Sequence, residues 1–175
     1  MQIVDRIFEP YIDQKTVEEA ISRVAKQINK DYEGQSIVFL GILNGAFMFC
    51  SDLMKNIHVE ADISFVKLSS YEGTKSGGTV HELIGLVQSL KGKHVVIVED
   101  IVDTGLTLDK IFSMIDGDQP ASVQVATLLF KPSAYKGCHV PKYIGLEIPD
   151  EFVVGYGMDY QGIGRNIPAI YKIKH

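Results

Sequence analysis

VVIVEDIVDTGLT, residues 95–107, joins an apolar run, two adjacent acids and a turn of small residues. The run Val95–Val98 is typical of a parallel strand that is covered on both faces. The turn Asp103–Thr107 leads into apolar spacing that predicts a helix over Leu106–Ile115, and a helix N-terminus suits an anion. A simpler interpretation, a capped helix after a core strand with Asp103 as the cap, leaves the two acids unexplained. The stretch therefore predicts a strand–turn–helix unit with an anion site at the turn.

The two acids, Glu99 and Asp100, narrow the choice of ligand. A carboxylate about 4 Å from a phosphate is repelled by roughly 4 kcal/mol at an effective dielectric of about 20. We therefore expect these acids to accept hydrogen bonds from sugar hydroxyls or to meet phosphate through a divalent cation. The phosphate would lie on the turn, where Gly105 permits close approach and the Thr104 and Thr107 hydroxyls add donors. These groups predict a ribose 5-phosphate site. Neighbours on a strand point to opposite faces, so we expect the strand to end near Glu99 if both acids serve one ligand.

Composition favours an ordinary globular chain. The sequence has 175 residues, 46% hydrophobic and 22% charged, which is typical of one domain spanning residues 1–175. A net charge of −5 argues against non-specific nucleic-acid binding, which needs a basic surface. The longest apolar stretch, Ile37–Cys50, is interrupted by glycines and is too short to cross a bilayer. No targeting segment is visible at the start of the chain, so we expect a cytoplasmic protein with reduced Cys50 and Cys138.

Apolar segments alternate with helical patterns along the chain, and this order predicts a doubly wound, mostly parallel α/β sheet. The expected strands are Ile37–Ile42, Ile63–Leu68, Val95–Val98 and Val123–Phe130, and the expected helices are Lys15–Asn29, Phe47–Leu53 and Leu106–Ile115. From about residue 143 to residue 175, short apolar segments separated by glycines and prolines predict a small irregular lobe that closes over the sheet. In such sheets the ligand lies beyond the carboxyl ends of the strands.

Several polar elements outside the opening stretch are candidates for the same site. Ser69–Val80 is a glycine-containing polar segment that is either a lid or a surface loop, and its place at a strand end favours the lid. Lys131 directly follows a strand and is either a donor to a ligand carbonyl or a solvated lysine. Arg165 could bind an anion through its planar guanidinium, and Asp159 could approach a metal, although each is weak evidence alone.

The motifs together resemble a known family. VEDIVDTGLT resembles the motif that binds phosphoribosyl pyrophosphate (PRPP) in type I phosphoribosyltransferases, and the rest of the chain resembles the branch that acts on hypoxanthine, or on hypoxanthine and guanine. GILNGAFMF is similar to its pyrophosphate loop, SSYEGTKSGG to its catalytic loop and ATLLFKPSA to its purine-contacting lysine strand. EIPDEFVVGYGMDYQGIGRNIP is similar to its C-terminal hood. The matches occur in the family's order over roughly residues 37–173.

The resemblance implies purine salvage. The implied reaction transfers the phosphoribosyl group of PRPP to N9 of hypoxanthine, and also of guanine, with Mg²⁺ as the cofactor, and gives IMP or GMP and pyrophosphate. The implied partners are PRPP, a 6-oxopurine and further copies of the chain, as a homodimer or a homotetramer. Nothing in the sequence ranks hypoxanthine, guanine and xanthine, or chooses between two and four copies.

The resemblance also gives roles to the residues around the ribose. Glu99 and Asp100 would bind the ribose hydroxyls, directly or with magnesium, and Asp103 would handle the proton at N7 of the purine. The 5-phosphate would lie on the turn formed by Asp103, Thr104, Gly105, Leu106 and Thr107. Ser70 and Tyr71 would close over the reacting atoms as further catalytic residues.

The same resemblance places the base and the pyrophosphate. Lys131 would contact the purine 6-oxo group, Phe152 would stack on the base and Val153 would offer backbone contacts. Asp159 would lie beside the purine and hold a second magnesium. Pyrophosphate would be bound by Leu43, Asn44, Gly45 and Arg165, with a non-proline cis peptide in the loop. Many members of the family carry a basic residue where this chain has Asn44, which leaves the charge of the pyrophosphate to magnesium and Arg165.

Two other functions explain part of the pattern. A non-catalytic regulator with the same fold would bind PRPP or a nucleotide to control a partner, but Asp103, Lys131 and the hood motif argue for catalysis. A phosphoacceptor signalling domain also has paired acids near a strand end. It needs a phosphorylatable aspartate at a different strand end, and it does not explain the DTGLT turn.

Overall fold

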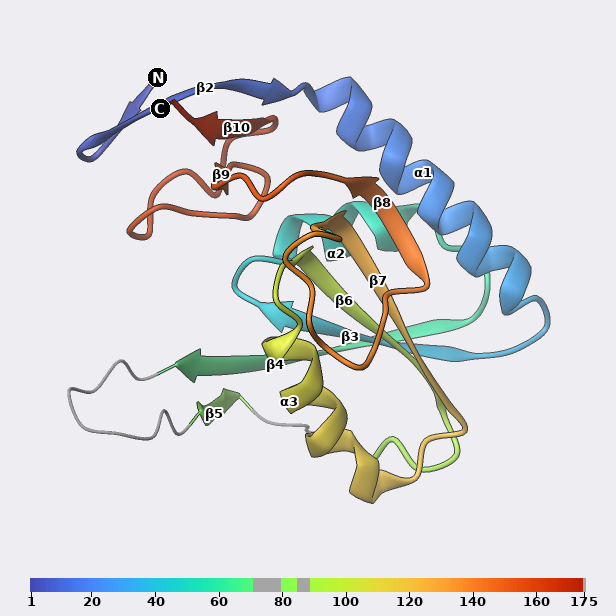
Figure 1. Cartoon of the computed structure of the whole chain (residues 1–175). Helices are drawn as coiled ribbons and strands as arrows, with labels where there is room; N and C mark the ends of the chain where they lie inside the picture. The colour runs from blue at the N-terminus through green and yellow to red at the C-terminus, as the bar shows by residue number, and fades with distance from the viewer. Residues whose placement is uncertain (71–79, 85–88, 175) are drawn as a thin grey trace.

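A computed structural model of the chain describes residues 1–70, 80–84 and 89–174 (Figure 1). Residues 71–79, which make up most of the expected lid and include Tyr71, lie outside the described residues, as do residues 85–88 and 175.

The central sheet is mostly parallel, as predicted. Its strand order is β5-β4-β3-β6-β7-β8; the four pairs from β4 to β8 are parallel, and β5 alone is antiparallel to its neighbour. The strands are β3 (Ile37–Leu43), β4 (Ala61–Ser70), β5 (Val80–Ile84), β6 (His94–Val102), β7 (Ser122–Phe130) and β8 (Tyr143–Glu147). Side chains on both faces of β3 and β6 are buried, which explains why these strands are continuous apolar runs rather than alternating ones.

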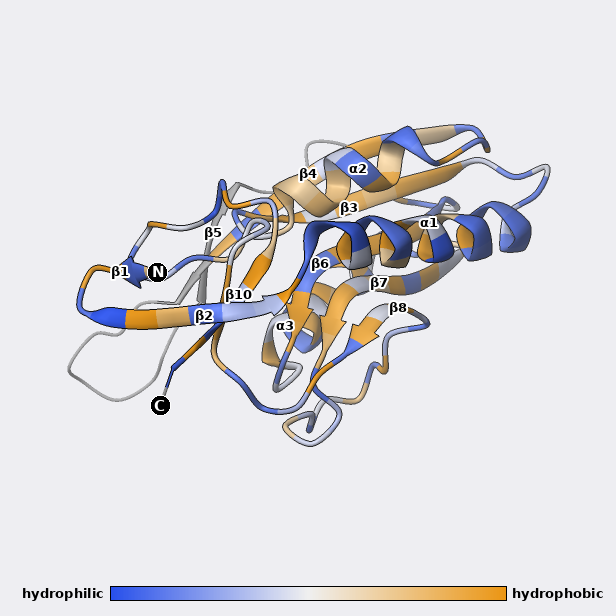
Figure 2. Ribbon diagram, turned by 90° about the horizontal axis from the view of Figure 1, so that it is seen from above, coloured by the Kyte–Doolittle hydropathy of each residue, from blue (hydrophilic) through white to orange (hydrophobic). Residues whose placement is uncertain are grey.

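Helices cover both faces of this sheet, so the doubly wound prediction is confirmed (Figures 1 and 2). One face packs against α1 (Gln14–Asp31) and α2 (Phe47–Lys55), and the other packs against α3 (Leu106–Ile115), which is followed by a short 3₁₀ helix at Asp116–Asp118. In α1 the buried side chains recur at helical spacing: Val17, Ala20, Ile21, Val24, Ala25 and Ile28. None of the helices in the described ranges has both the length and the apolar character needed to cross a membrane.

A second, smaller sheet forms the hood, with strand order β1-β2-β10-β9. Its strands are β1 (Gln2–Ile3), β2 (Arg6–Ile12), β9 (Val153–Val154) and β10 (Ile170–Ile173). The N-terminal and C-terminal ends of the chain thus lie together in the hood (Figure 1). The Tyr156 hydroxyl donates a hydrogen bond of 2.5 Å to Asp52 Oδ2 in α2, and this contact fastens the hood to the central sheet's helical layer.

The expected lobe at residues 143–175 needs two corrections. The segment Tyr143–Glu147 is not part of the hood, because β8 pairs in parallel with β7 as the last strand of the central sheet. The hood also contains β1 and β2, within residues 2–12, where the sequence pattern predicts no strand. In β2 the side chain of Phe8 is the one that is fully buried, so this strand lacks the alternation that marks a half-buried strand in a sequence.

Candidate active site

Glu99 and Asp100 lie in the middle of β6 rather than at its end. The strand continues to Val102, because its backbone ladder with β7 runs past the acids, so the expected strand end near Glu99 is wrong. Both side chains are only 8% exposed. Glu99 lines a cavity of about 260 Å³ together with the Asp103–Thr107 turn, and Asp100 lines a cavity of about 220 Å³ beneath the hood.

These two cavities adjoin, because both are lined by Ile101 and Asp103. A third cavity, of about 430 Å³, shares Glu99, Thr104 and Thr107 with the cavity at the Asp103–Thr107 turn. The acids can therefore serve one extended ligand even though the strand does not end between them. One end of that ligand would meet the hood, and the other would meet the start of α3.

The electrostatics of the acid pair favour a bound cation. Burial raises the pKa of Glu99 well above its ordinary value, and the adjacent charge of Asp100 raises it further. Burial also raises the pKa of Asp100, although the backbone N–H of Ile101 and the charge of Arg165 partly oppose the effect. Glu99 Oε2 is buried and has no hydrogen-bond partner among the described residues. Mg²⁺ is usually held by one or two carboxylates, with substrate phosphates and water completing its shell, so this donor set fits magnesium.

The raised pKa of Glu99 gives a testable pH dependence of stability. A folded-state pKa above the unfolded value means that the folded protein binds more protons, so stability falls as pH rises through the interval between the two values. We expect Glu99→Gln to reduce this loss, so that the variant gains stability over the wild type on going from mildly acidic to mildly alkaline pH in EDTA. Urea unfolding at the two pH values measures the difference. An equal change in both proteins would mean that Glu99 is not a strained buried acid.

The turn after β6 presents backbone N–H groups to one of these cavities. The N-cap of α3 is Gly105, with φ 91° and no side-chain hydrogen bond, so the interpretation of Asp103 as the cap is wrong. An uncapped helix start leaves N–H groups for an anion. A Cβ at Gly105 would lie 2.6 Å from the Tyr135 ring, which explains why this position has no side chain. The backbone N–H of Lys136 donates a hydrogen bond of 3.0 Å to the Thr104 carbonyl and so helps to fix the turn.

Lys131 is buried and ion-paired, so the interpretation as a solvated lysine is wrong. Its side chain is 7% exposed, and Nζ lies 2.8 Å from Asp103 Oδ2 and 3.0 Å from Asp150 Oδ1. Its backbone N donates to the Val102 carbonyl at 3.0 Å, which brings the end of β7 beside the end of β6. Burial acts to lower the pKa of Lys131, but the hydrogen bonds with both carboxylates outweigh burial and raise it.

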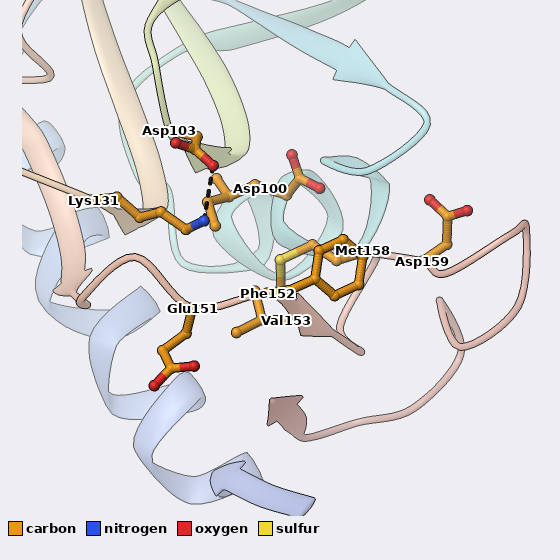
Figure 3. A pocket seen from close by; sticks show the side chains of 9 residues that line it. Asp100, Asp103, Lys131, Glu151, Phe152, Val153, Met158 and Asp159 are labelled. Atoms are coloured by element: carbon orange, nitrogen blue, oxygen red, sulfur yellow. Dashed lines mark hydrogen bonds and ion pairs between the residues drawn. The ribbon is translucent and has the colours of Figure 1, made fainter. Parts of the chain in front are cut away.

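The cavity beneath the hood combines this ion pair with apolar groups (Figure 3). It is lined by Asp100, Ile101, Asp103, Lys131, Glu151, Phe152, Val153, Met158 and Asp159. Phe152 is 47% exposed and meets the Tyr160 ring edge-on at 5.8 Å, which leaves a ring face for a planar ligand. Val153 is buried, and its backbone pairs with Lys172 in the hood sheet. A planar ligand in this cavity could thus contact a cation, an acid and an aromatic ring.

The loop between β3 and α2 packs against the acids. The Leu43–Asn44 peptide is cis, and Asn44 is exposed. A Cβ at Gly45 would overlap the Asp100 carboxylate, and a Cβ at Gly157 of the hood would overlap the Gly45 carbonyl oxygen. The Gly45 backbone is therefore held between Asp100 and the hood, so the sequence-predicted pyrophosphate loop does lie beside the acid pair.

Arg165 and Asp159 contact each other instead of being solvated singly. Arg165 Nη2 lies 2.5 Å from Asp159 Oδ1, and Nη1 donates to the Gly157 carbonyl at 2.7 Å. Asp159 Oδ2 accepts a hydrogen bond from Gly162 N at 2.6 Å. The structure therefore brings both residues to the site, where Arg165 orders the hood loop. Their expected contacts to pyrophosphate and magnesium stay predictions. Ser70 is the last residue of β4, and its role also stays a prediction.

Sequence reasoning missed two site elements. Asp150 lies in an exposed loop, and nothing local in the IPDEF segment marks it as a partner of Lys131. Gly157 stands in a glycine-rich run of the sequence, and three successive positive φ values, at Gly155, Tyr156 and Gly157, show that this run is a tightly shaped loop. The two glycines that flank Tyr156 were the available signal for that loop.

Comparison with known proteins places the chain in a class. The family of the phosphoribosyl transferase domain matches residues 10–161. The chain therefore belongs to the phosphoribosyltransferase family, and its mostly parallel, doubly wound sheet is the type I fold of that family.

Within this family the chain is an enzyme of the hypoxanthine-guanine phosphoribosyltransferase group. A hypoxanthine-guanine phosphoribosyltransferase of Staphylococcus aureus is 41% identical over 167 residues, which cover 95% of this chain and 93% of that protein. One from Staphylococcus epidermidis is 43% identical over 162 residues, 90% of each chain. The crystal structure of a hypoxanthine-guanine phosphoribosyltransferase from Bacillus anthracis superimposes with a TM-score of 0.89 at 36% identity, covering 95% of this chain and 98% of that one.

Proposed function

We propose that this enzyme serves purine salvage by transferring the 5-phosphoribosyl group of PRPP to N9 of hypoxanthine, and also of guanine, in a magnesium-dependent reaction. The products are IMP or GMP and pyrophosphate. The main support for the proposal is the Lys131–Asp103 ion pair of 2.8 Å. Asp103 lines both the cavity beneath the hood and the cavity at the Asp103–Thr107 turn, the proposed phosphate turn. A base held at the ion pair would have its reacting nitrogen directed at a ribose bound over Glu99 and Asp100.

The binding roles follow from the chemistry of each group. The 5-phosphate lies on the turn that begins α3, where backbone N–H groups and the hydroxyls of Thr104 and Thr107 donate to it. Glu99 and Asp100 accept hydrogen bonds from the ribose hydroxyls, or they hold a magnesium ion to which the hydroxyl oxygens would coordinate. When bound, magnesium neutralises charge on the departing pyrophosphate. Lys131 donates to the 6-oxo group of the base, and Phe152 stacks on its ring.

The reaction moves one proton and exchanges one bond at C1′ of the ribose. The bond from C1′ to the pyrophosphate oxygen breaks, and a bond forms between C1′ and N9 of the base. The N7 proton passes to Asp103, whose Oδ2 is engaged by Lys131, so Oδ1 is the accepting oxygen. Ser70 and Tyr71 close over the reacting atoms and exclude water, which would otherwise capture the ribosyl cation.

Pyrophosphate would be held by Arg165 and the Leu43–Gly45 loop, with Asp159 on a second magnesium. Arg165→Lys keeps the positive charge but loses the planar guanidinium, whose two terminal nitrogens contact Asp159 and the Gly157 carbonyl at the same time. We expect the KM for PRPP to rise roughly tenfold, corresponding to about 1.4 kcal/mol, with a smaller effect on the KM for hypoxanthine. Steady-state kinetics with each substrate varied in turn measures the two constants. The exposed Arg6→Lys is the matched control, and an unchanged KM for PRPP in Arg165→Lys would remove Arg165 from pyrophosphate binding.

Product formation tests the proposed reaction. The protein is incubated with PRPP, MgCl₂ and hypoxanthine, and IMP is separated by chromatography; parallel reactions contain EDTA in place of MgCl₂, or guanine or xanthine in place of hypoxanthine. We expect IMP in the complete mixture and none with EDTA. PRPP binding without any nucleotide product would instead support a non-catalytic regulator. The expected assembly of two or four copies rests on the resemblance, and light scattering measures the number of copies. The cytoplasmic location stays a prediction.

A further inference from the structure

The Lys131 ammonium is held by two acids that come from different parts of the fold. Asp103 belongs to the turn after β6, and Asp150 belongs to the loop between β8 and β9. Asp103 and Lys131 line the hood cavity, whereas Asp150 lies outside the set of described residues that line it. The ammonium is thus bound by one carboxylate that lines the cavity and by one, 68% exposed, that does not.

An ammonium group has three protons, arranged around its axis, and no acceptor. The contacts of 2.8 Å and 3.0 Å use two of these protons, so the third has a fixed direction once both acids are in place. With Asp103 alone, the group could rotate about its last bond and could shift toward both oxygens of that carboxylate. A second acid therefore restricts the ammonium in a way that a single ion pair does not.

We propose that Asp150 is a positioning residue that orients the Lys131 ammonium, so that its third proton meets the 6-oxo group of the base and Asp103 keeps one oxygen for N7. The inference rests on the proposed function, because it deepens the role of Lys131 in that reaction. Asp150 would then set the preference for bases that carry an acceptor at position 6, without touching the base.

Charge balance and exposure argue against a purely structural role for Asp150. One carboxylate, Asp103, is enough to neutralise Lys131, and a second leaves the cluster with net negative charge. The Asp150 side chain is 68% exposed, and ion pairs with exposed partners contribute little to stability. Asp150 therefore orients the Lys131 ammonium rather than adding to the stability of the fold.

The test compares two bases that differ at position 6 and, with it, in the proton on N1. Hypoxanthine has the 6-oxo acceptor, and unsubstituted purine lacks it. The KM for hypoxanthine and the inhibition constant of purine against hypoxanthine are measured for the wild type, Asp150→Ala and Asp150→Asn. Glu147→Gln, which changes an exposed carboxyl group at the end of β8, just before the loop that carries Asp150, is the matched control. Thermal unfolding of each protein checks that the variants are folded.

We expect Asp150→Ala to weaken hypoxanthine binding roughly tenfold, as the loss of one charge-assisted contact would, while purine binding changes little. Asp150→Asn keeps an acceptor oxygen for the ammonium, so it should retain more of the preference than alanine does. Equal weakening of both bases, or no change in either, would overturn the proposal. Wild-type protein that makes no IMP would refute the proposed function instead, so the two failures are distinguishable.

Discussion

Asp103→Asn is expected to lower kcat by roughly 10²- to 10⁴-fold, which is the usual contribution of a positioned general base. Asparagine is nearly the same size and its oxygen can still accept from Lys131 Nζ, so the ion-pair geometry of 2.8 Å is largely preserved. It cannot take the N7 proton. The KM for PRPP should stay close to the wild-type value, because the phosphate turn is built from backbone groups and hydroxyls.

The measurement is steady-state formation of IMP, with PRPP and hypoxanthine each varied in turn. Asp116→Asn makes the same chemical change at an exposed position outside the site and should leave both constants unchanged. Wild-type turnover in Asp103→Asn would remove Asp103 from the mechanism. A large rise in the KM for PRPP with unchanged kcat would instead make Asp103 a phosphate-binding residue.

The parts of the fold that the sequence predicted are those that rest on local patterns. The bounds of α3, Leu106–Ile115, agree with the predicted helix, because apolar spacing begins immediately after Gly105. β3 and β7 were recognised as apolar runs, since strands buried on both faces need no polar residues. The sequence also assigned Glu99, Asp100 and the Asp103–Thr107 turn to one site, and in the structure they line adjoining cavities. The ribose and phosphate assigned to these residues stay predictions.

The parts that the sequence did not predict rest on pairings between distant segments. β6 continues past Glu99 because its partner β7 supplies backbone hydrogen bonds whatever the side chain, with Glu99 opposite Thr127. β2 is a strand because β10 pairs with it, and Phe8 lies opposite Ile173 from the far end of the chain. The contact of Asp150 with Lys131 is of the same kind. Local polarity and spacing carry no information about such partners.

The contact between Gly157 and Gly45 is the second feature whose loss should have a large effect. Gly157 has φ 97°, and a Cβ there would overlap the Gly45 carbonyl oxygen, a backbone atom that cannot rotate away. Gly157→Ala is therefore expected to cost about 2–4 kcal/mol of stability, from left-handed strain and overpacking together. Because Gly157 also accepts from Arg165 Nη1, the KM for PRPP should rise in the protein that remains folded.

Gly34→Ala separates backbone strain from overpacking in this prediction. Gly34 has φ 73°, but a Cβ there would meet nothing within 4 Å, so its replacement should cost only the strain, about 1 kcal/mol, with no change in KM. Urea unfolding of both variants gives the two costs, and kinetics with PRPP gives the second readout. If Gly157→Ala costs no more than Gly34→Ala, the hood does not hold the pyrophosphate loop. If Gly157→Ala costs more than Gly34→Ala and the KM for PRPP rises, then the hood, which binds the base, also holds the loop that binds the leaving pyrophosphate. The backbone contact between Gly157 and Gly45 would then couple the base site to the pyrophosphate site.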